Sequence, residues 1–153
     1  METSEILTTI GLVIALFAAI YSIHTNKIQT KAFNKQLKLN FFTEYTRRYQ
    51  EIILNLPENI NDGDFDFNSL DEDVKNKTLR YMRAYFDLSS EEYDLYKSGY
   101  LDKKIWENWE EGIKYAMSKT AFIKAWEIIK LDTIYYSEFT KWMNEILSPK
   151  MNS

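Results

Sequence analysis

The 153-residue chain contains no cysteine and has only one histidine, four glycines and two prolines. Without cysteine it can form no disulfide, no thiolate metal site and no thiol nucleophile. The few glycines and prolines disfavour a sheet-rich fold with many turns, and the isolated glycines form no glycine-rich phosphate loop. The single histidine, His24, lies at the edge of an apolar segment, so the later part of the chain has no histidine–carboxylate pair for acid–base catalysis. The composition therefore argues against an enzyme, and no cofactor or metal is expected.

The longest uncharged stretch runs from Ile6 to Ile23 and reads ILTTIGLVIALFAAIYSI. A helix of about 18 residues is about 27 Å long, close to the thickness of the hydrocarbon core of a bilayer. The chain starts with the acidic METSE rather than the basic residues typical of a signal peptide, so a retained transmembrane helix is predicted at residues 6–23. Lysines follow the segment, and the positive-inside rule then places residues 1–5 outside the cell and the rest in the cytoplasm.

Small and weakly polar residues recur along this segment at alternating spacings of four and three. They are Ser4, Thr8, Gly11, Ala15, Ala18, Ser22, Thr25 and Gln29. This heptad period is typical of a left-handed helix bundle, whereas lipid favours apolar bulk on every face. The row, called here the small-residue seam, therefore predicts self-association. Two interpretations remain: the seam packs helices together, or four or more copies turn it toward a central pore.

No proline or glycine lies between the apolar segment and Pro57, so the helix is expected to continue to about Leu54, as a cytoplasmic extension at residues 24–54. The heptad pattern of the seam continues there, and in a ring of subunits it would line a polar vestibule. The continuing positions are Ala32, Gln36, Leu39, Thr43, Thr46 and Gln50. A row of lysines beside the seam can contact anionic lipid headgroups or hold an anionic ligand. This lysine row consists of Lys27, Lys31, Lys35 and Lys38.

Residues 55–70 are polar and acidic and are predicted to form a solvated loop. The stretch DGDFDFNSLDED has the alternating acidic residues of a calcium-binding loop. However, it has Phe67 where that loop needs glycine for a sharp turn, so calcium binding is disfavoured.

Residues 71–148 are predicted to form a helical cytoplasmic domain. Apolar residues at helical spacing indicate a first helix from Leu70 to Leu88. Ser89 and Glu92 have the spacing of a capping box that would begin a new, short helix, and Gly99 would end it.

Two further helices are expected after Gly99. Asp102 is placed to cap the first of them. The last helix is expected to run from Lys119 to Leu147, with Tyr136 on its apolar face and Pro149 in the tail at residues 149–153. The predicted fold is all-α: one transmembrane helix continues into a helical bundle, and the chain is oligomeric.

The region from Arg83 to Ile113 contains an arginine before an aromatic–Asp–Leu step, then Ser-Glu-Glu-Tyr, Leu-Tyr, Gly-aromatic-hydrophobic-Asp and two tryptophans. The matching residues are Arg83, Phe86, Asp87, Leu88, Ser90, Glu91, Glu92, Tyr93, Leu95, Tyr96, Gly99, Tyr100, Leu101, Asp102, Trp106 and Trp109, with Arg47, Arg48 and Tyr49 upstream. This pattern resembles a family of small bacterial membrane-anchored proteins of unassigned function.

The layout of the chain, a membrane helix followed by a helical cytoplasmic domain, also resembles the transmembrane effector of Hailong-type anti-phage systems. This second resemblance rests on layout and size. It implies a homotetrameric ion channel in the inner membrane of a bacterium. It further implies a partner nucleotidyltransferase that makes a single-stranded oligodeoxyadenylate, which binds the cytoplasmic domain and holds the pore shut. Loss of this ligand would open the pore, depolarise the cell and stop phage replication.

Basic and aromatic side chains suit such an anionic, base-bearing ligand. The candidate contacts are Lys35, Arg47, Arg48, Arg80 and Arg83, with Tyr45 and Tyr49 for base stacking. An alternative function remains: a non-conducting, membrane-tethered helical module that docks a protein partner.

Overall fold

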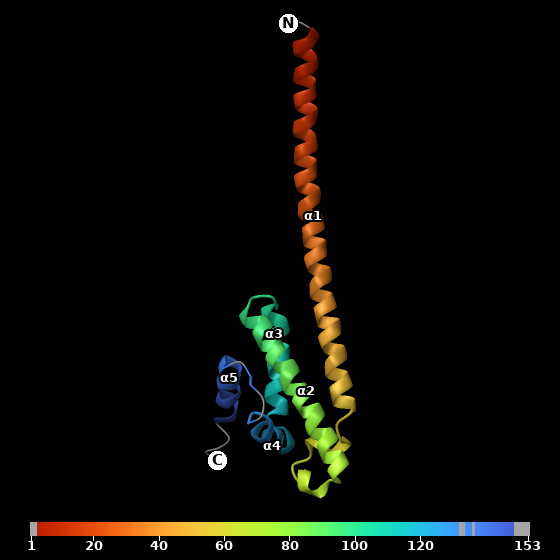
Figure 1. The fold of residues 1–153 in the computed structure, drawn as a ribbon. Helices are drawn as coiled ribbons and strands as arrows, with labels where there is room; N and C mark the ends of the chain where they lie inside the picture. The colour runs from red at the N-terminus through yellow and green to blue at the C-terminus, as the bar shows by residue number, and fades with distance from the viewer. Residues whose placement is uncertain (1–2, 132–133, 136, 149–153) are drawn as a thin grey trace. The chain divides into compact units, whose positions relative to one another are not determined.

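The computed structural model describes residues 3–131, 134–135 and 137–148. Among these residues every regular element is helical, which confirms the all-α class (Figure 1). The elements are α1 (Thr3–Leu54), the 3-10 turns η1 (Glu58–Asn61) and η2 (Phe67–Ser69), α2 (Glu72–Lys97), α3 (Lys103–Ala116), α4 (Thr120–Ile129) and α5 (Ser137–Leu147). The expected tail at residues 149–153, including Pro149, and the expected apolar Tyr136 lie outside the described residues, as do residues 1–2.

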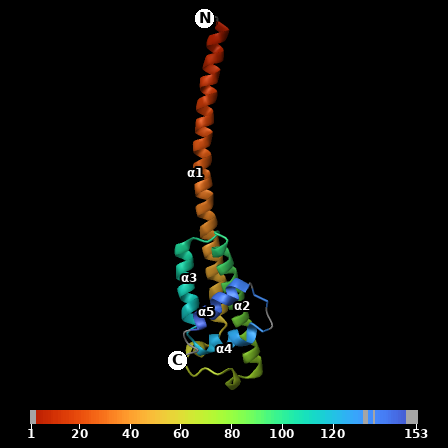
Figure 2. The ribbon, with the colours of Figure 1, turned by 90° about the vertical axis from the view of Figure 1, so that its left-hand side faces the viewer.

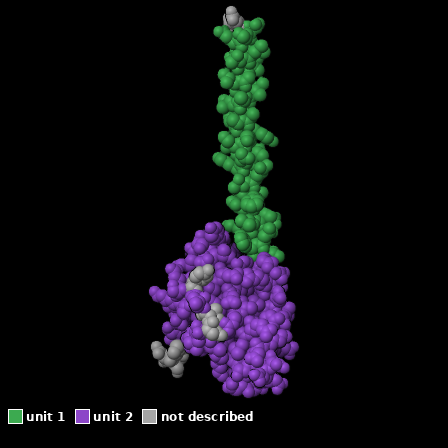
Figure 3. All heavy atoms as spheres, in the orientation of Figure 1, with its two compact units in different colours: residues 1–43 green, residues 44–153 purple. Residues whose placement is uncertain are grey.

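The chain divides into two compact units, residues 1–43 and residues 44–153 (Figure 3). We call the second unit the helical domain. In the first unit α1 contains an apolar stretch long enough to cross a membrane, and none of that stretch is buried within the structure. Such a helix is compatible with a single-pass anchor or with a signal sequence. α1 ends at Leu54, the position at which the sequence predicts its end.

The helical domain is organised around α2, which contacts α3, α4 and α5 (Figure 2). Phe86 of α2 is fully buried and meets Trp126 of α4 edge to face, with ring centroids 5.1 Å apart. Trp126 in turn meets Phe139 of α5 at 6.0 Å. Because each ring buries a large apolar area, aromatic pairs of this kind can build a core in a small domain.

The sequence-based prediction of a helix end at Leu88 is wrong, because α2 continues through this position to Lys97. Ser89 does not cap a new helix. It is buried, and its hydroxyl donates a hydrogen bond back to the carbonyl of Tyr85 at 2.9 Å. A serine inside a helix can satisfy its hydroxyl in this way without ending the helix. The predicted stop at Gly99 is confirmed, since this residue has a φ of 76° just after the end of α2.

The prediction of one last helix from Lys119 to Leu147 is also wrong. α4 ends at Ile129 and α5 begins at Ser137. Both helices contact α2, so the break allows two apolar faces to be buried against one helix, which a straight helix of the same length could not do. The predicted cap of α3 is confirmed, because the Asp102 carboxylate accepts a hydrogen bond from the backbone N–H of Lys104 at 3.0 Å.

The acidic segment at residues 55–70 is less solvated than expected. Phe65 and Phe67 are buried and meet edge to face at 5.1 Å. Ile60 of η1 is buried as well. The acidic side chains therefore lie on a segment that its apolar residues anchor to the helical domain, and Phe67 is used for packing where a calcium loop would turn.

Candidate functional site

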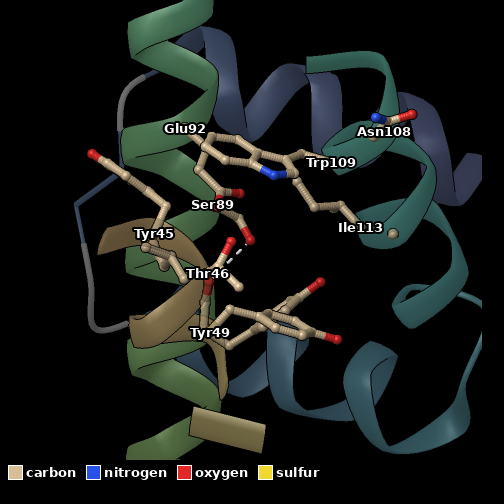
Figure 4. Close-up of a pocket in the computed structure, with 11 residues that line it drawn as sticks. Tyr45, Thr46, Tyr49, Ser89, Glu92, Asn108, Trp109 and Ile113 are labelled. Atoms are coloured by element: carbon tan, nitrogen blue, oxygen red, sulfur yellow. Dashed lines mark hydrogen bonds between the residues drawn. The ribbon is translucent and has the colours of Figure 1, made fainter. Parts of the chain in front are cut away.

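A pocket of about 220 Å³ lies inside the helical domain, between the last turns of α1 and the helices α2 and α3 (Figure 4). Each helix contributes side chains three or four residues apart, which is the spacing that places them on one helix face. The polar and aromatic lining includes Tyr45, Thr46 and Tyr49 of α1, Ser89 and Glu92 of α2, and Trp109 of α3. In Figure 4 Thr46, Tyr49, Ser89 and Trp109 lie around one space, whereas Asn108 lies to one side of it.

Aromatic rings form much of the wall. The ring of Tyr45 stacks on Trp109 with centroids 5.4 Å apart and an interplanar angle of 30°. Tyr49 lies 6.5 Å from the ring of Tyr85, which is almost fully buried. Burial raises the pKa of the Tyr45, Tyr49 and Tyr85 phenols, so all three stay neutral at physiological pH.

Glu92 is the buried carboxyl group of the pocket, with only 7% of the residue exposed. Burial raises its pKa from 4.5 to about 8, while the nearby charge of Arg48 opposes this rise and that of Glu91 adds to it. Within the described parts of the chain, no hydrogen bond or ion pair to its carboxyl oxygens is found. An acid in this state is mostly protonated at neutral pH and gains from any partner that stabilises its charged form.

The rim of the pocket is held by an ion pair between α1 and α2. Arg48 donates from Nη1 to Glu91 Oε2 at 2.6 Å and from Nη2 to Glu91 Oε1 at 3.2 Å. The hydroxyl of Tyr45 also donates to Glu91 Oε2, at 3.4 Å, and the guanidinium lies 5.3 Å from the Tyr45 ring centroid. A two-pronged pair of this kind fixes geometry as well as charge.

The structure brings together only part of the ligand-contact set predicted from the sequence. Tyr45 and Tyr49 line the pocket, and Arg48 lies at its rim in the pair with Glu91. Arg47 is exposed and donates to Glu44 at 2.7 Å, with Glu51 at 3.5 Å.

The other predicted contacts lie elsewhere. Arg80 is exposed and Arg83 half-buried on α2, and neither is in the pocket wall. Lys35 belongs to the first unit, where the lysine row, together with Thr30 and Asn34, lines one side of α1.

Sequence reasoning missed Glu92 and Trp109 as members of one site. The spacing of Tyr85, Ser89 and Glu92 contains the signal, because residues four and three apart share a helix face. This shared face can be recognised only if α2 is one continuous helix, as it is in the structure. The local sequence instead predicts a helix boundary at Ser89.

The seam residues lie on an exposed part of α1, apart from the partly exposed Thr25. The hydroxyl of Thr8 donates to the carbonyl of Ser4 at 2.8 Å, so this polar group is satisfied within the helix. A Cβ added at Gly11 would meet nothing within 4 Å, and the backbone there has no positive φ. The chain itself therefore does not require a small residue at this position.

No protein-family model, no curated protein and no solved structure matches the chain. Among the described residues, no group of three or more histidine, cysteine, aspartate or glutamate side chains could hold a metal ion. The function is therefore argued from the seam, the lysine row and the pocket.

Proposed function

We propose that the protein is a membrane-anchored, homo-oligomeric pore-forming effector of anti-phage defence, whose cytoplasmic part controls the pore through a bound ligand. The main support is the small-residue seam, which lies on the apolar stretch of α1. No part of that stretch is buried against the rest of the chain. The proposed assembly is a homotetramer in the inner membrane of a bacterium, with the N-terminus outside.

The seam supports self-association because packing within a single subunit does not require small residues at these positions. Gly11 has open space around its Cβ position, so a larger side chain would be tolerated in an isolated subunit. Small residues let helix backbones approach closely in a membrane, where lipid provides no hydrophobic force for association. Thr8, bonded to its own helix, can face either a neighbouring helix or a weakly polar passage.

Anchoring is favoured over a cleaved signal because α1 continues without interruption into residues 44–54. In the helical domain this last part of α1 supplies the buried Tyr45 and Ile52. The helix that contains the apolar stretch thus also contributes to the folded core.

The proposed gating ligand is a single-stranded oligodeoxyadenylate made by a nucleotidyltransferase partner. The lysine row offers closely spaced positive charge to its phosphates, and the same charge suits anionic lipid headgroups. Arg48 is already paired with Glu91, so phosphate contacts are expected from the lysine row rather than from Arg48.

The test is ion flux through liposomes that contain the full-length protein, with and without the oligodeoxyadenylate. We expect flux that the oligonucleotide suppresses. Ala18→Leu should change conductance at unchanged membrane insertion, because it places a bulky side chain on the seam. Ala19→Leu is the matched control, since it makes the same substitution one residue off the seam.

The alternative is a non-conducting, membrane-tethered interaction module, which the seam also supports because helix packing alone needs small residues. Absence of flux in both conditions, from protein shown to be inserted and oligomeric, would reject the pore and leave this alternative. Flux that the oligonucleotide does not change would keep the pore and reject the proposed ligand.

A further inference from the structure

We propose that the pocket between α1, α2 and α3 binds a small organic cation, a primary or quaternary alkylammonium, with Glu92 as counter-charge and Tyr45, Tyr49 and Trp109 as the surrounding rings. This proposal concerns the helical domain alone and does not depend on the pore or on its ligand.

The aromatic wall of the pocket favours binding of a cation. The faces of tyrosine and tryptophan rings carry partial negative charge and attract ammonium groups, most strongly where water is excluded. Four rings of this kind line the pocket, those of Tyr45, Tyr49, Tyr85 and Trp109, and Tyr45 and Trp109 are held together by stacking at 5.4 Å. This stacking orders Tyr45 and Trp109 before a ligand binds. Because Tyr45 already has Trp109 and the Arg48 guanidinium against its ring, the ammonium group is expected at Tyr49 and at the outer face of Trp109.

Glu92 is a buried carboxyl group without a counter-ion in the part of the chain that the structure describes. It is more than nine-tenths buried, and no partner for its carboxyl oxygens is found among the described residues. A buried carboxylate without a counter-ion is costly, and a cation in contact with it removes that cost. Protonation, or contact with water that enters the pocket, is the other way in which this group can lower that cost.

The charges around the pocket favour a cation over an anion. Arg48, whose positive charge acts on Glu92, is already bound by both carboxylate oxygens of Glu91. An anionic ligand would meet Glu92 and a neutralised arginine, whereas a cation would meet an unpaired carboxyl group. The electrostatics of the pocket therefore select against phosphate and for ammonium.

The volume limits the size of the ligand. A water molecule in the liquid occupies about 30 Å³, so a pocket of about 220 Å³ has room for about seven atoms of similar size. Choline and n-butylamine fall within this limit.

Binding should depend on pH, because the ligand favours ionised Glu92. Around this group α1 contributes Tyr45, Arg48 and Tyr49, and α2 contributes Tyr85 and Glu91. The pKa values of the three phenols are raised, Arg48 stays charged, and the lining residues of α3 are not titratable. The affinity for the cation should therefore rise at least about tenfold between about pH 6 and about pH 9, with release of a proton on binding.

Calorimetric titration of the full-length protein in detergent micelles tests this proposal with choline, n-butylamine and 3,3-dimethyl-1-butanol, the uncharged analogue of choline. At least one ammonium compound should bind at least about tenfold more tightly than the alcohol. If only choline or only butylamine binds, the class of ammonium is identified. The proposal is overturned if the alcohol binds as tightly as the tighter-binding of the two cations, or if neither cation gives heat or a change in tryptophan fluorescence.

Two variants and one control variant complete the test. Glu92→Gln should weaken cation binding at least about tenfold and abolish its pH dependence, because the amide cannot ionise. Glu111→Gln, which removes an exposed carboxylate from α3, is the matched control and should bind as the wild type does. Trp109→Leu removes a ring while Glu92 remains, so it should weaken binding without removing the pH dependence. Unchanged affinity in Glu92→Gln would overturn the assignment.

Discussion

The buried Glu92 makes the stability of the helical domain depend on pH in a direction that can be worked out from the structure. Burial raises its pKa from 4.5 to about 8 in the folded protein. A raised pKa means that the folded state holds the proton more tightly than the unfolded state does. The contribution of this group to stability is therefore fully present below about pH 4.5 and is lost as the pH rises through about 8.

Replacing Glu92 with glutamine removes this dependence, because glutamine stays neutral at every pH. The pKa difference corresponds to about 5 kcal/mol at about 1.4 kcal/mol for each pKa unit. This value is an upper limit, since water that enters the pocket solvates the carboxylate and lowers the penalty. We expect Glu92→Gln to gain at least about 2 kcal/mol in unfolding free energy over the wild type between about pH 5 and about pH 9.

The assay is urea unfolding of the full-length protein in detergent micelles, followed by tryptophan fluorescence at several pH values and without added amines. Glu111→Gln serves as the control, because its carboxylate is exposed and its pH curve should run parallel to that of the wild type. Parallel curves for Glu92→Gln and the wild type would refute the reasoning, since they would mean that Glu92 titrates alike in the folded and unfolded states.

Three further predictions concern the packing of the helical domain, each measured by thermal or urea unfolding of the full-length protein. Arg48→Ala should lower the free energy of unfolding by about 1 kcal/mol, because it breaks the pair with Glu91 at the pocket rim. Arg47→Ala, on the exposed surface, should leave the stability unchanged, and equal losses in the two variants would contradict the assigned role of the rim pair. Phe86→Ala should cost about 3–5 kcal/mol, since the ring is fully buried against α4, and a loss of less than about 1 kcal/mol would be incompatible with this packing. Gly99→Ala should cost about 1 kcal/mol because the φ of 76° is unfavourable for a residue with a Cβ, and an unchanged stability would show that the end of α2 relaxes without cost.

Several features of the fold follow from signals that act within a few residues. A long helix to Leu54 is predicted because nothing before Pro57 breaks it, and α1 ends there. Asp102 caps α3 and Gly99 follows the end of α2, as expected from the local chemistry of helix ends. These features were predictable because the groups that decide them are neighbours in the chain.

Other features depended on residues that are distant in sequence. Ser89 has a sequence context suitable for a cap, but packing buries it inside a continuous α2, where its hydroxyl bonds back to Tyr85. No glycine or proline marks the break after α4, which allows both α4 and α5 to contact α2. In both cases the gain from burying an apolar face outweighs a local preference of a fraction of a kcal/mol to about 1 kcal/mol.

The pocket belongs to this second group as well. Its walls come from three helices, and the raised pKa of Glu92 exists only because α1 and α3 cover that part of α2. In the sequence, Glu92 is one acidic residue among many on a polar-looking stretch. Burial, the partners of Arg48 and the position of Trp109 make it a candidate site, and all three are set by tertiary packing, since a side chain's exposure to water depends on the helices that surround it.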